Sequence, residues 1–294
     1  MSSGTPQGVV SQYGIGIDIG GTGTKGGIVD LATGQLVGER FRIPTPHPAT
    51  PEAVADVVRQ IVDELQSRPE APAPDSNVGI VFPAIIKNGV ALSAANVDKS
   101  WINTDVDAMM TETMGREVVN TDVDALMTET LGREVEALND ADGAGLAEAH
   151  YGAGKGKEGL VMVITLGTGI GSAMILNGQL VPNAELGHLE IDGHDAETRA
   201  SAAAREREQL PWKKWATKRL QRYFSHVEFL FSPSLFIIGG GVSKNSEKFL
   251  PYLELRTPVE IAALRNNAGI VGAALWAQQC RGAQAAKPVI DPVD

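Results

Sequence analysis

The apolar residues of the chain recur with two different periods, and together these predict an α/β protein. Continuous or alternating apolar runs predict buried strands, which we place at 13–19, 26–31, 36–43, 78–82, 160–166, 172–176 and 235–238. Apolar residues three or four positions apart predict helices at 51–67, 141–152, 198–228 (broken near Pro211) and 268–279. The first helix has a clear start, because Thr50 is a common type of N-cap and Pro51 suits the first helical position.

One segment of the chain occurs twice in tandem. Asn103–Val118 recurs as Asn120–Val135, and the copies differ only as Met109/Leu126 and Met114/Leu131. Two copies are too few for a repeat solenoid, which needs about three units or more, so we interpret them as a local duplication. The second copy leads directly into Glu136–Asp140 and is expected to keep the strand. The first copy is then an additional helix and turn on the surface.

Composition and charge narrow the class of protein. The chain has 294 residues, 43% of them hydrophobic, which suits one large domain or two lobes. Its net charge of −11 argues against general nucleic-acid binding, and any polyanionic substrate must meet a local basic patch. The single cysteine, Cys280, excludes a disulfide framework and a cysteine-rich zinc site. Residues 1–12 lack a signal-peptide core and no apolar run reaches roughly 18 residues, so we expect a cytoplasmic enzyme without nucleic-acid or membrane partners.

The stretch from Asp18 to Lys25 predicts a β-hairpin whose turn can hold phosphate. Glycine lets the backbone approach a ligand closely, so that N–H groups can cradle a phosphate, while hydroxyl and ammonium groups add further donors. The residues that would do so are Gly20, Gly21, Thr22, Gly23, Thr24 and Lys25. Asp18, at the end of the strand, could hold Mg²⁺ through water. The pattern is neither a P-loop nor a Rossmann turn, and an ordinary glycine-rich hairpin is the alternative.

Two further glycine turns follow predicted strands. The second contains Gly167, Thr168 and Gly169. The third contains Gly239, Gly240 and Gly241, followed by Lys244. A single turn of this kind is weak evidence for a ligand, but three turns at strand ends are hard to explain by structure alone. Together they favour two lobes that clasp a phosphate chain.

Polar residues between these turns suggest the chemistry. Asp140 lies where a strand meets a helix and could act as a general base, and Asn139 can pair with a hydroxyl group. The alternative is that Asp140 or Asp142 caps the helix. Glu185 and His188 suit adjacent sugar hydroxyls better than zinc, because no cysteine is near. The alternative there is a polar surface turn.

Taken in order, these motifs resemble those of the ROK sugar kinases, members of the actin-like superfamily. The segments that carry the resemblance are Asp18–Lys25, Asn139–Asp140, Leu166–Gly171, Glu185–His188 and Gly239–Gly241. Within the family the chain is most similar to the polyphosphate glucokinases, which include a polyphosphate/ATP-glucomannokinase. The segments that indicate this subgroup are Ala94–Trp101, Val181–Glu190 and Leu220–Pro233.

The resemblance implies a two-lobed actin-like (ribonuclease H-like) α/β fold. The small lobe would comprise residues 13–138, completed by the helix 268–280, and the large lobe residues 139–267. Residues 1–12 and 282–294 would be tails. By analogy with the family, a homodimer is expected.

The resemblance also implies roles for single residues. Asp140 would be the base that deprotonates the 6-hydroxyl group of the sugar. The other sugar-binding residues would be Asn96, Asn139, Glu185, His188 and Glu197. The first two glycine turns would hold donor phosphates with Mg²⁺, and the third turn would face adenosine when ATP is the donor. The family's cysteine-rich zinc segment is missing, so Glu197 would act without zinc.

The activity implied is phosphoryl transfer from inorganic polyphosphate, and from ATP, to glucose, with mannose as a further candidate substrate. Two alternatives stay open at this stage. One is a glucokinase that uses ATP only. The other is a non-catalytic sugar sensor on the same fold, which the intact Asp140 disfavours because a sensor needs no base.

Overall fold

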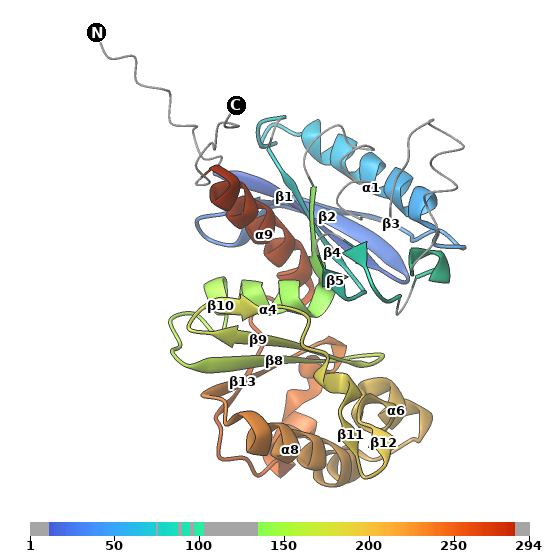
Figure 1. The fold of residues 1–294 in the computed structure, drawn as a ribbon, viewed down its shortest axis with the longest axis vertical. Helices are drawn as coiled ribbons and strands as arrows, with labels where there is room; N and C mark the ends of the chain where they lie inside the picture. Colours follow the sequence, from blue (N-terminus) through green and yellow to red (C-terminus); the bar gives the residue numbers. More distant parts are fainter. Residues whose placement is uncertain (1–11, 75, 88–89, 95–96, 103–134, 286–294) are drawn as a thin grey trace, which may run out of the picture.

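The computed structural model describes residues 12–74, 76–87, 90–94, 97–102 and 135–285 (Figure 1). Asn96 and almost all of the duplicated segment, including the expected extra helix, lie outside the described residues. Within the part described, no helix is both long and apolar enough to cross a membrane.

The first sheet has five strands in the order β3-β2-β1-β4-β7. Their bounds are β1 (Tyr13–Gly20), β2 (Gly23–Asp30), β3 (Gln35–Ile43), β4 (Val78–Phe82) and β7 (Val135–Asn139). The strands β1, β2 and β3 form an antiparallel meander, whereas β1, β4 and β7 run parallel. Helix α1 (Pro51–Gln66) and helix α9 (Ala268–Ala285) cover opposite faces of this sheet (Figure 1). Neighbouring residues of β2 show this, because Gly26 faces Ile61 of α1 while Gly27 faces Ile270 of α9.

The second sheet also has five strands, in the order β10-β9-β8-β13-β14. Their bounds are β8 (Leu160–Leu166), β9 (Ile170–Leu176), β10 (Gln179–Val181), β13 (Leu235–Gly239) and β14 (Val259–Ile261). One face packs against α4 (Asp140–Tyr151). The other face packs against helical segments with the bounds α5 (Glu197–Ala200), α6 (Ala202–Arg207), α7 (Trp212–Trp215), the π-helical η3 (Ala216–Leu220) and α8 (Gln221–Phe231). Both faces are apolar because alternate residues of β8 and β13 belong to different core clusters.

Helices α4 and α9 pack against each other between the two sheets (Figure 1). Glycine allows α9 to approach both the strand β4 and the helix α4 closely. A β-carbon at Gly79 would overlap the carbonyl group of Ala273, and one at Gly272 would overlap the carbonyl group of Gly143. The small-residue sequence of α9 therefore lets the helix join both sheets into one body.

Shorter elements complete the described fold. They are β5 (Ile86–Lys87), β6 (Val90–Ala91), η1 (Lys99–Trp101), η2 (Leu186–His188), β11 (Glu190–Ile191), β12 (His194–Asp195), η4 (Gly241–Lys248), η5 (Leu250–Tyr252) and η6 (Arg265–Asn267). The predicted strands and the helices at 51–67, 141–152 and 268–279 are confirmed within a few residues at their ends, apart from the longer C-terminal helix. The region 198–228 breaks near Pro211 as expected, and also at Ser201, whose hydroxyl caps α6. The three-residue strand β14 was not predicted, because it is too short to show a period.

Candidate active site

Two cavities meet at Asp140, between the two sheets. The larger one, about 650 Å³, is lined on one side by Asn139 and on the other by the turn 167–171 and by Glu185, His188 and Glu197. The smaller one, about 230 Å³, is lined by charged residues and by the turn 239–241. Asp140, Ala141, Thr165 and Gly240 line both. A group bound in one cavity can therefore reach a group bound in the other beside the Asp140 carboxylate.

Asp140 is the first residue of α4, immediately after β7. Its neighbour Asn139 caps the helix, with Oδ1 accepting from the N–H groups of Ala141 (2.9 Å) and Asp142 (3.1 Å). This corrects the alternative expectation that Asp140 or Asp142 is the cap. Asp140 is exposed to the cavities, yet it is surrounded by enough protein that desolvation raises its pKa to about 6. The nearby charge of Asp18 contributes to this shift, and the result is a carboxylate suited to accept a proton near neutral pH.

Asp142 lies behind Asp140 and is fully buried. Its Oδ2 accepts from the backbone N–H of Asn183 (2.6 Å), whereas its Oδ1 has no hydrogen-bond partner among the described residues. Burial raises the pKa of Asp142 to about 7, although the Asn183 N–H opposes this shift. The Asn183 side chain also bonds both backbone groups of Ile86, at 3.0 and 2.7 Å. Asn183 thereby links the β5–β6 hairpin to α4, a role that the sequence did not suggest.

The raised pKa of Asp142 predicts a stability effect that depends on pH. The folded state retains the proton up to about pH 7, whereas the unfolded carboxyl group loses it near its ordinary pKa of 3.8. The free energy of unfolding therefore falls as pH rises through that window. Asp142→Asn, which mimics the protonated form, should raise the thermal midpoint relative to wild type more at pH 8 than at pH 5. Calorimetry at both values measures this difference.

The control for Asp142→Asn is Asp63→Asn, which removes an exposed carboxylate on α1. It should shift the midpoint little and by similar amounts at both pH values. An Asp142→Asn difference that is the same at pH 5 and pH 8 would contradict a buried carboxyl group that is neutral in the folded state.

Glu185, His188 and Glu197 come together on the far side of the large cavity. The turn η2 is fixed against β9, because the Ser172 hydroxyl accepts from the Leu186 N–H (2.9 Å) and donates to the Ala184 carbonyl. Glu197 starts α5, and its Oε2 accepts from the Ile170 N–H (3.0 Å). Burial raises the pKa of Glu185, opposed by His188 and supported by Glu197. Glu185 and His188 lie at the turn that the alternative expected, and both also line the large cavity beside Asp140.

The hairpin formed by β1 and β2 contributes fewer residues to the cavities than its sequence predicted. Lys25 pairs with Asp18 (Nζ to Oδ2, 2.6 Å), and both line the small cavity. None of residues 20–24 lines either cavity. The Thr24 hydroxyl is fully buried and pairs with Thr45 Oγ1 (3.4 Å), which corrects its expected role as a phosphate donor. The carbonyl groups of Gly20 and Thr22 are also used, by Thr45 and by Arg42.

Each of the other two glycine turns lines one of the cavities. Gly167, Thr168 and Gly169 line the large cavity. Gly239, Gly240, Gly241 and Lys244 line the small one. Gly240 has φ of +81°, and a β-carbon there would overlap the backbone of Leu166, so only glycine fits. Arg265 also lines the small cavity, although no sequence motif indicated it.

Comparison with known proteins agrees with this geometry. The model of the ROK family matches residues 14–206. The polyphosphate glucokinase of Mycobacterium tuberculosis (strain H37Rv) is 47% identical over 93% of this chain and 94% of its own length. The crystal structure of inorganic polyphosphate/ATP-glucomannokinase from Arthrobacter sp. strain KM is 64% identical, with a TM-score of 0.81 over 91% of this chain and 99% of that one.

A more distant solved structure is a ROK family glucokinase from Streptomyces griseus in complex with glucose and AMPPNP. It is 25% identical, with a TM-score of 0.70 over 91% of this chain and 99% of that one. These likenesses confirm the predicted two-lobed actin-like α/β fold.

Proposed function

Since this chain belongs to the ROK family, we propose that it transfers a phosphoryl group from inorganic polyphosphate to the 6-hydroxyl group of glucose. The observation that carries the proposal is the position of Asp140, where a cavity lined by Glu185 and His188 meets one lined by Lys25 and Lys244. The names of the relatives at 47% and 64% identity support both substrates.

In this mechanism Asp140 accepts the proton of the 6-hydroxyl group. The freed oxygen forms a bond to the terminal phosphorus, the bridging P–O bond breaks, and the polyphosphate leaves one unit shorter. Glu185, His188 and Glu197 hold the remaining hydroxyl groups as acceptors and donors. Asn139 offers the sugar only its second Nδ2 N–H, because its Oδ1 accepts two N–H groups and its Nδ2 already donates to the Ala84 carbonyl (2.9 Å). Asn96, outside the described residues, stays a prediction.

Kinases of this kind need a divalent metal, and we propose Mg²⁺. The residues fit, because Asp18 offers a carboxylate in the small cavity and Mg²⁺ commonly binds through one or two carboxylates while keeping its waters. When bound, the ion neutralises charge on the donor phosphates. We propose no zinc, because the one cysteine, Cys280, lies in α9.

ATP is a second candidate donor. Arg265 and Asn266 line the small cavity together with the turn 239–241, which would face adenosine. The relative at 64% identity is named for both donors, and the Streptomyces griseus structure holds AMPPNP.

A homodimer and a cytoplasmic location also stay proposals. Exposed Phe229 and Leu230 on α8 support self-association, and sedimentation analysis would test it.

The function is tested by measuring glucose 6-phosphate formation in a coupled assay with polyphosphate and with ATP, on glucose and on mannose. We expect product from glucose with polyphosphate. Product with ATP alone would leave the ATP-only alternative, and no product with either donor would leave the sugar sensor.

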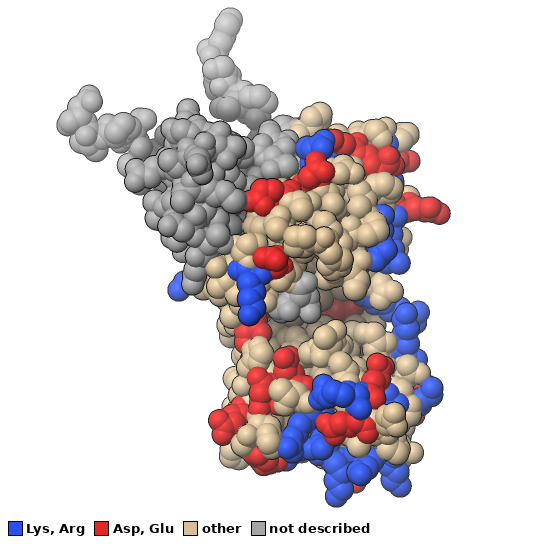
Figure 2. Space-filling model, turned by 90° about the vertical axis from the view of Figure 1, so that its right-hand side faces the viewer, with Lys and Arg blue, Asp and Glu red and all other residues tan. Residues whose placement is uncertain are grey.

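We predict that salt weakens the binding of polyphosphate more than that of glucose. Polyphosphate meets lysines as point charges, and such contacts are screened by ions. Basic side chains gather on the large lobe (Figure 2). Those of the α7–α8 region belong to helical segments that also carry the buried Trp215, Leu220 and Phe224, so a solvated helix face explains them as well. Lys244, which lines the small cavity, is therefore the sharper candidate.

Lys244→Gln should raise the KM for long polyphosphate more than the KM for ATP, with the KM for glucose nearly constant. Lys155→Gln, on the loop after α4, removes the same charge away from both cavities and serves as the control. Equal responses of both donors to salt and to Lys244→Gln would reject an extended basic path.

A further inference from the structure

A short hairpin, formed by β11 and β12, lies in the sequence between His188 and Glu197, and both of these residues line the large cavity. Strands β11 and β12 join through Asp192 and Gly193, whose φ values of 55° and 73° are those of a tight hairpin turn. At this turn Arg222 of α8 donates to both carboxylate oxygens of Asp192, at 3.1 and 2.8 Å, in an exposed ion pair that contributes little to stability. The pairing of β11 with β12, in which Asp195 lies opposite Glu190, sets the position of Asp195 at the end of β12.

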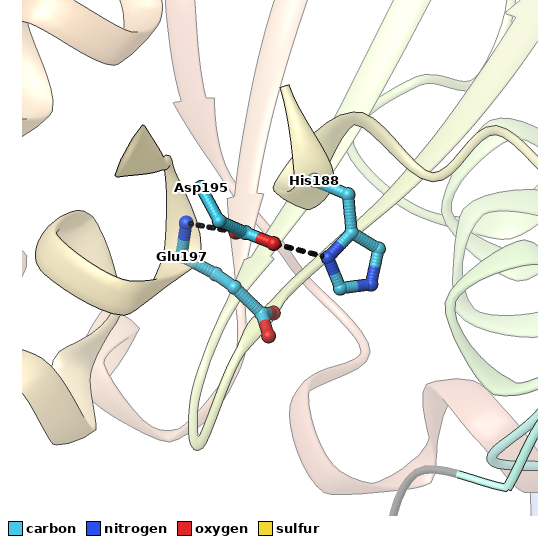
Figure 3. A group of neighbouring side chains, drawn as sticks. All are labelled: His188, Asp195 and Glu197. Carbon is cyan, nitrogen blue, oxygen red and sulfur yellow. Dashed lines mark hydrogen bonds and ion pairs between the residues drawn. The ribbon is translucent and has the colours of Figure 1, made fainter. Parts of the chain in front are cut away.

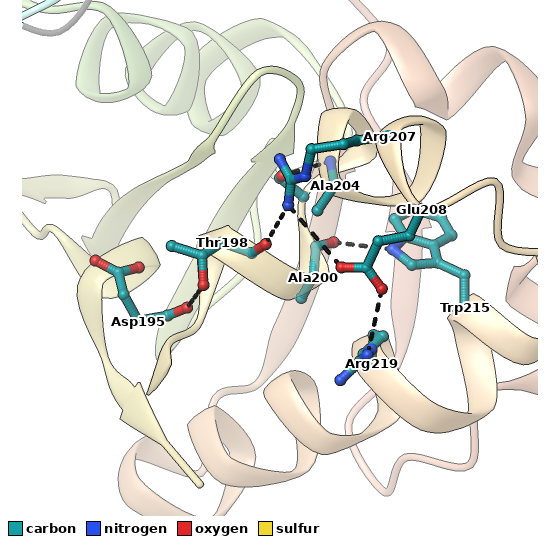
Figure 4. A network of polar contacts seen from close by, with 9 residues as sticks. Asp195, Thr198, Ala200, Ala204, Arg207, Glu208, Trp215 and Arg219 are labelled. Carbon is teal, nitrogen blue, oxygen red and sulfur yellow. Dashed lines mark hydrogen bonds and ion pairs between the residues drawn. The ribbon is translucent and has the colours of Figure 1, made fainter. Parts of the chain in front are cut away.

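Asp195 touches both His188 and Glu197 (Figure 3). Its Oδ2 lies 2.8 Å from His188 Nδ1, and its Oδ1 accepts from the Glu197 backbone N–H at 3.2 Å. Its carbonyl group accepts from the Thr198 hydroxyl at 2.6 Å (Figure 4). One residue thus connects the turn η2 with the helix α5.

Further bonds fix helix α5 from its other side (Figure 4). Arg207 donates to the Thr198 carbonyl (2.7 Å), and the indole N–H of Trp215 donates to the Ala200 carbonyl (3.1 Å). The backbone of Glu197 is therefore well held, whereas the imidazole of His188 depends on Asp195 among the described residues.

Orientation matters for His188 because 57% of its side chain is exposed, so packing alone does not fix the ring. With Nδ1 bound to Asp195, Nε2 points away from the carboxylate (Figure 3). The charged groups facing the ring are Asp195, Glu197 and Glu185. The Asp195 carboxylate, which accepts the hydrogen bond of Nδ1, is the main cause that raises the pKa of His188; the charges of Glu197 and Glu185 act in the same direction, and partial burial opposes them.

We propose that Asp195 is a positioning residue for the sugar, because it holds the His188 ring so that Nε2 can form a hydrogen bond with a sugar hydroxyl group. This inference rests on the proposed function, because it takes the large cavity to be the sugar site. Asp195 does not touch the reacting atoms. It acts through His188, and through the N–H of Glu197 it keeps the two sugar-binding side chains in register.

The side chains of His188, Asp195 and Glu197 are also of types that bind metal ions, and their ligand atoms lie within 4.8 Å of one another. Their contacts are those of a hydrogen-bond network. Asp195 and His188 bond each other directly, and Glu197 accepts from the Ile170 N–H. The experiments below distinguish this hydrogen-bond network from a metal site.

The first measurement is kinetic. Asp195→Asn should raise the KM for glucose about 10-fold, the effect of one charge-assisted hydrogen bond. The kcat at saturating glucose and the KM for polyphosphate should change less than about twofold, since neither the base nor the donor cavity is altered. Asp192→Asn is the matched control, because it removes a carboxylate from the same hairpin at an exposed ion pair that contributes little.

The second measurement does not depend on activity. NMR titration of the five histidines, with His188 assigned through His188→Gln, reports the pKa of His188 directly. It should be lower in Asp195→Asn than in wild type and unchanged in Asp192→Asn. In the His188→Gln background, Asp195→Asn should add little to the KM for glucose.

Three results would overturn the proposal. The first is an Asp195→Asn variant that matches Asp192→Asn in both glucose KM and His188 titration. The second is an effect of Asp195→Asn that persists in full without His188. The third is a stoichiometric metal ion that wild type holds and Asp195→Asn loses. A wild type that binds glucose without phosphorylating it would reject the proposed function alone, because glucose affinity and the titration still test Asp195.

Discussion

Asp140→Asn should lower kcat for glucose phosphorylation by about 10²- to 10⁴-fold, the usual contribution of a general base. Asparagine keeps the shape of the side chain but cannot accept the proton of the 6-hydroxyl group. Glucose affinity, measured by calorimetry, should stay near the wild-type value. Because the pKa of Asp140 is raised to about 6, wild-type kcat/KM should also fall as pH drops below about 6, when the carboxylate is protonated.

Asp63→Asn provides the control for kcat, since it removes a carboxylate on the outer face of α1. Near-normal turnover of Asp140→Asn would reject Asp140 as the base. The helix cap cannot explain a loss of turnover, because Asn139 supplies that cap and is left in place.

Glu185→Ala is expected to weaken glucose binding by about 10- to 150-fold, because losing a hydrogen bond to a charged group costs roughly 1.5–3 kcal/mol. His188→Ala should behave similarly. The thermal midpoint without sugar should barely move, since neither side chain belongs to a core cluster. Calorimetric titration with glucose and a melting curve without it measure the two effects separately.

Glu190→Ala, on the exposed edge of β11, is the matched control, and it should leave glucose affinity unchanged. Unchanged affinity together with a lower melting temperature in Glu185→Ala would show that the pair supports the fold and does not bind the sugar.

The two sheets could be predicted from the sequence because their strands are long apolar runs that end at turn residues. Strands β4, β8 and β13 are buried on both faces, so nearly every position in them is apolar. Helix α1 carries a complete local pattern, from the cap Thr50 to its buried stripe. The positions of Asp140, Gly167 and Gly240 follow directly, because each lies at or near the end of such a strand.

Side-chain roles needed the tertiary structure, because partners distant in sequence decide them. Thr24 belongs to a glycine- and threonine-rich segment that is typical of a phosphate-binding loop, but its hydroxyl group is paired with Thr45 inside the protein. Asn139 takes the cap that its neighbour Asp140 could equally have taken.

The fold likewise recruits residues that carry no motif. Arg265 lines the small cavity because it lies in η6, where the chain passes from β14 of the second sheet to helix α9 on the first. Asp195 acquires its role from its bond to His188, seven positions away on another element. Local periodicity and turn chemistry therefore determined the elements, and the packing of those elements determined which polar groups face the cavities.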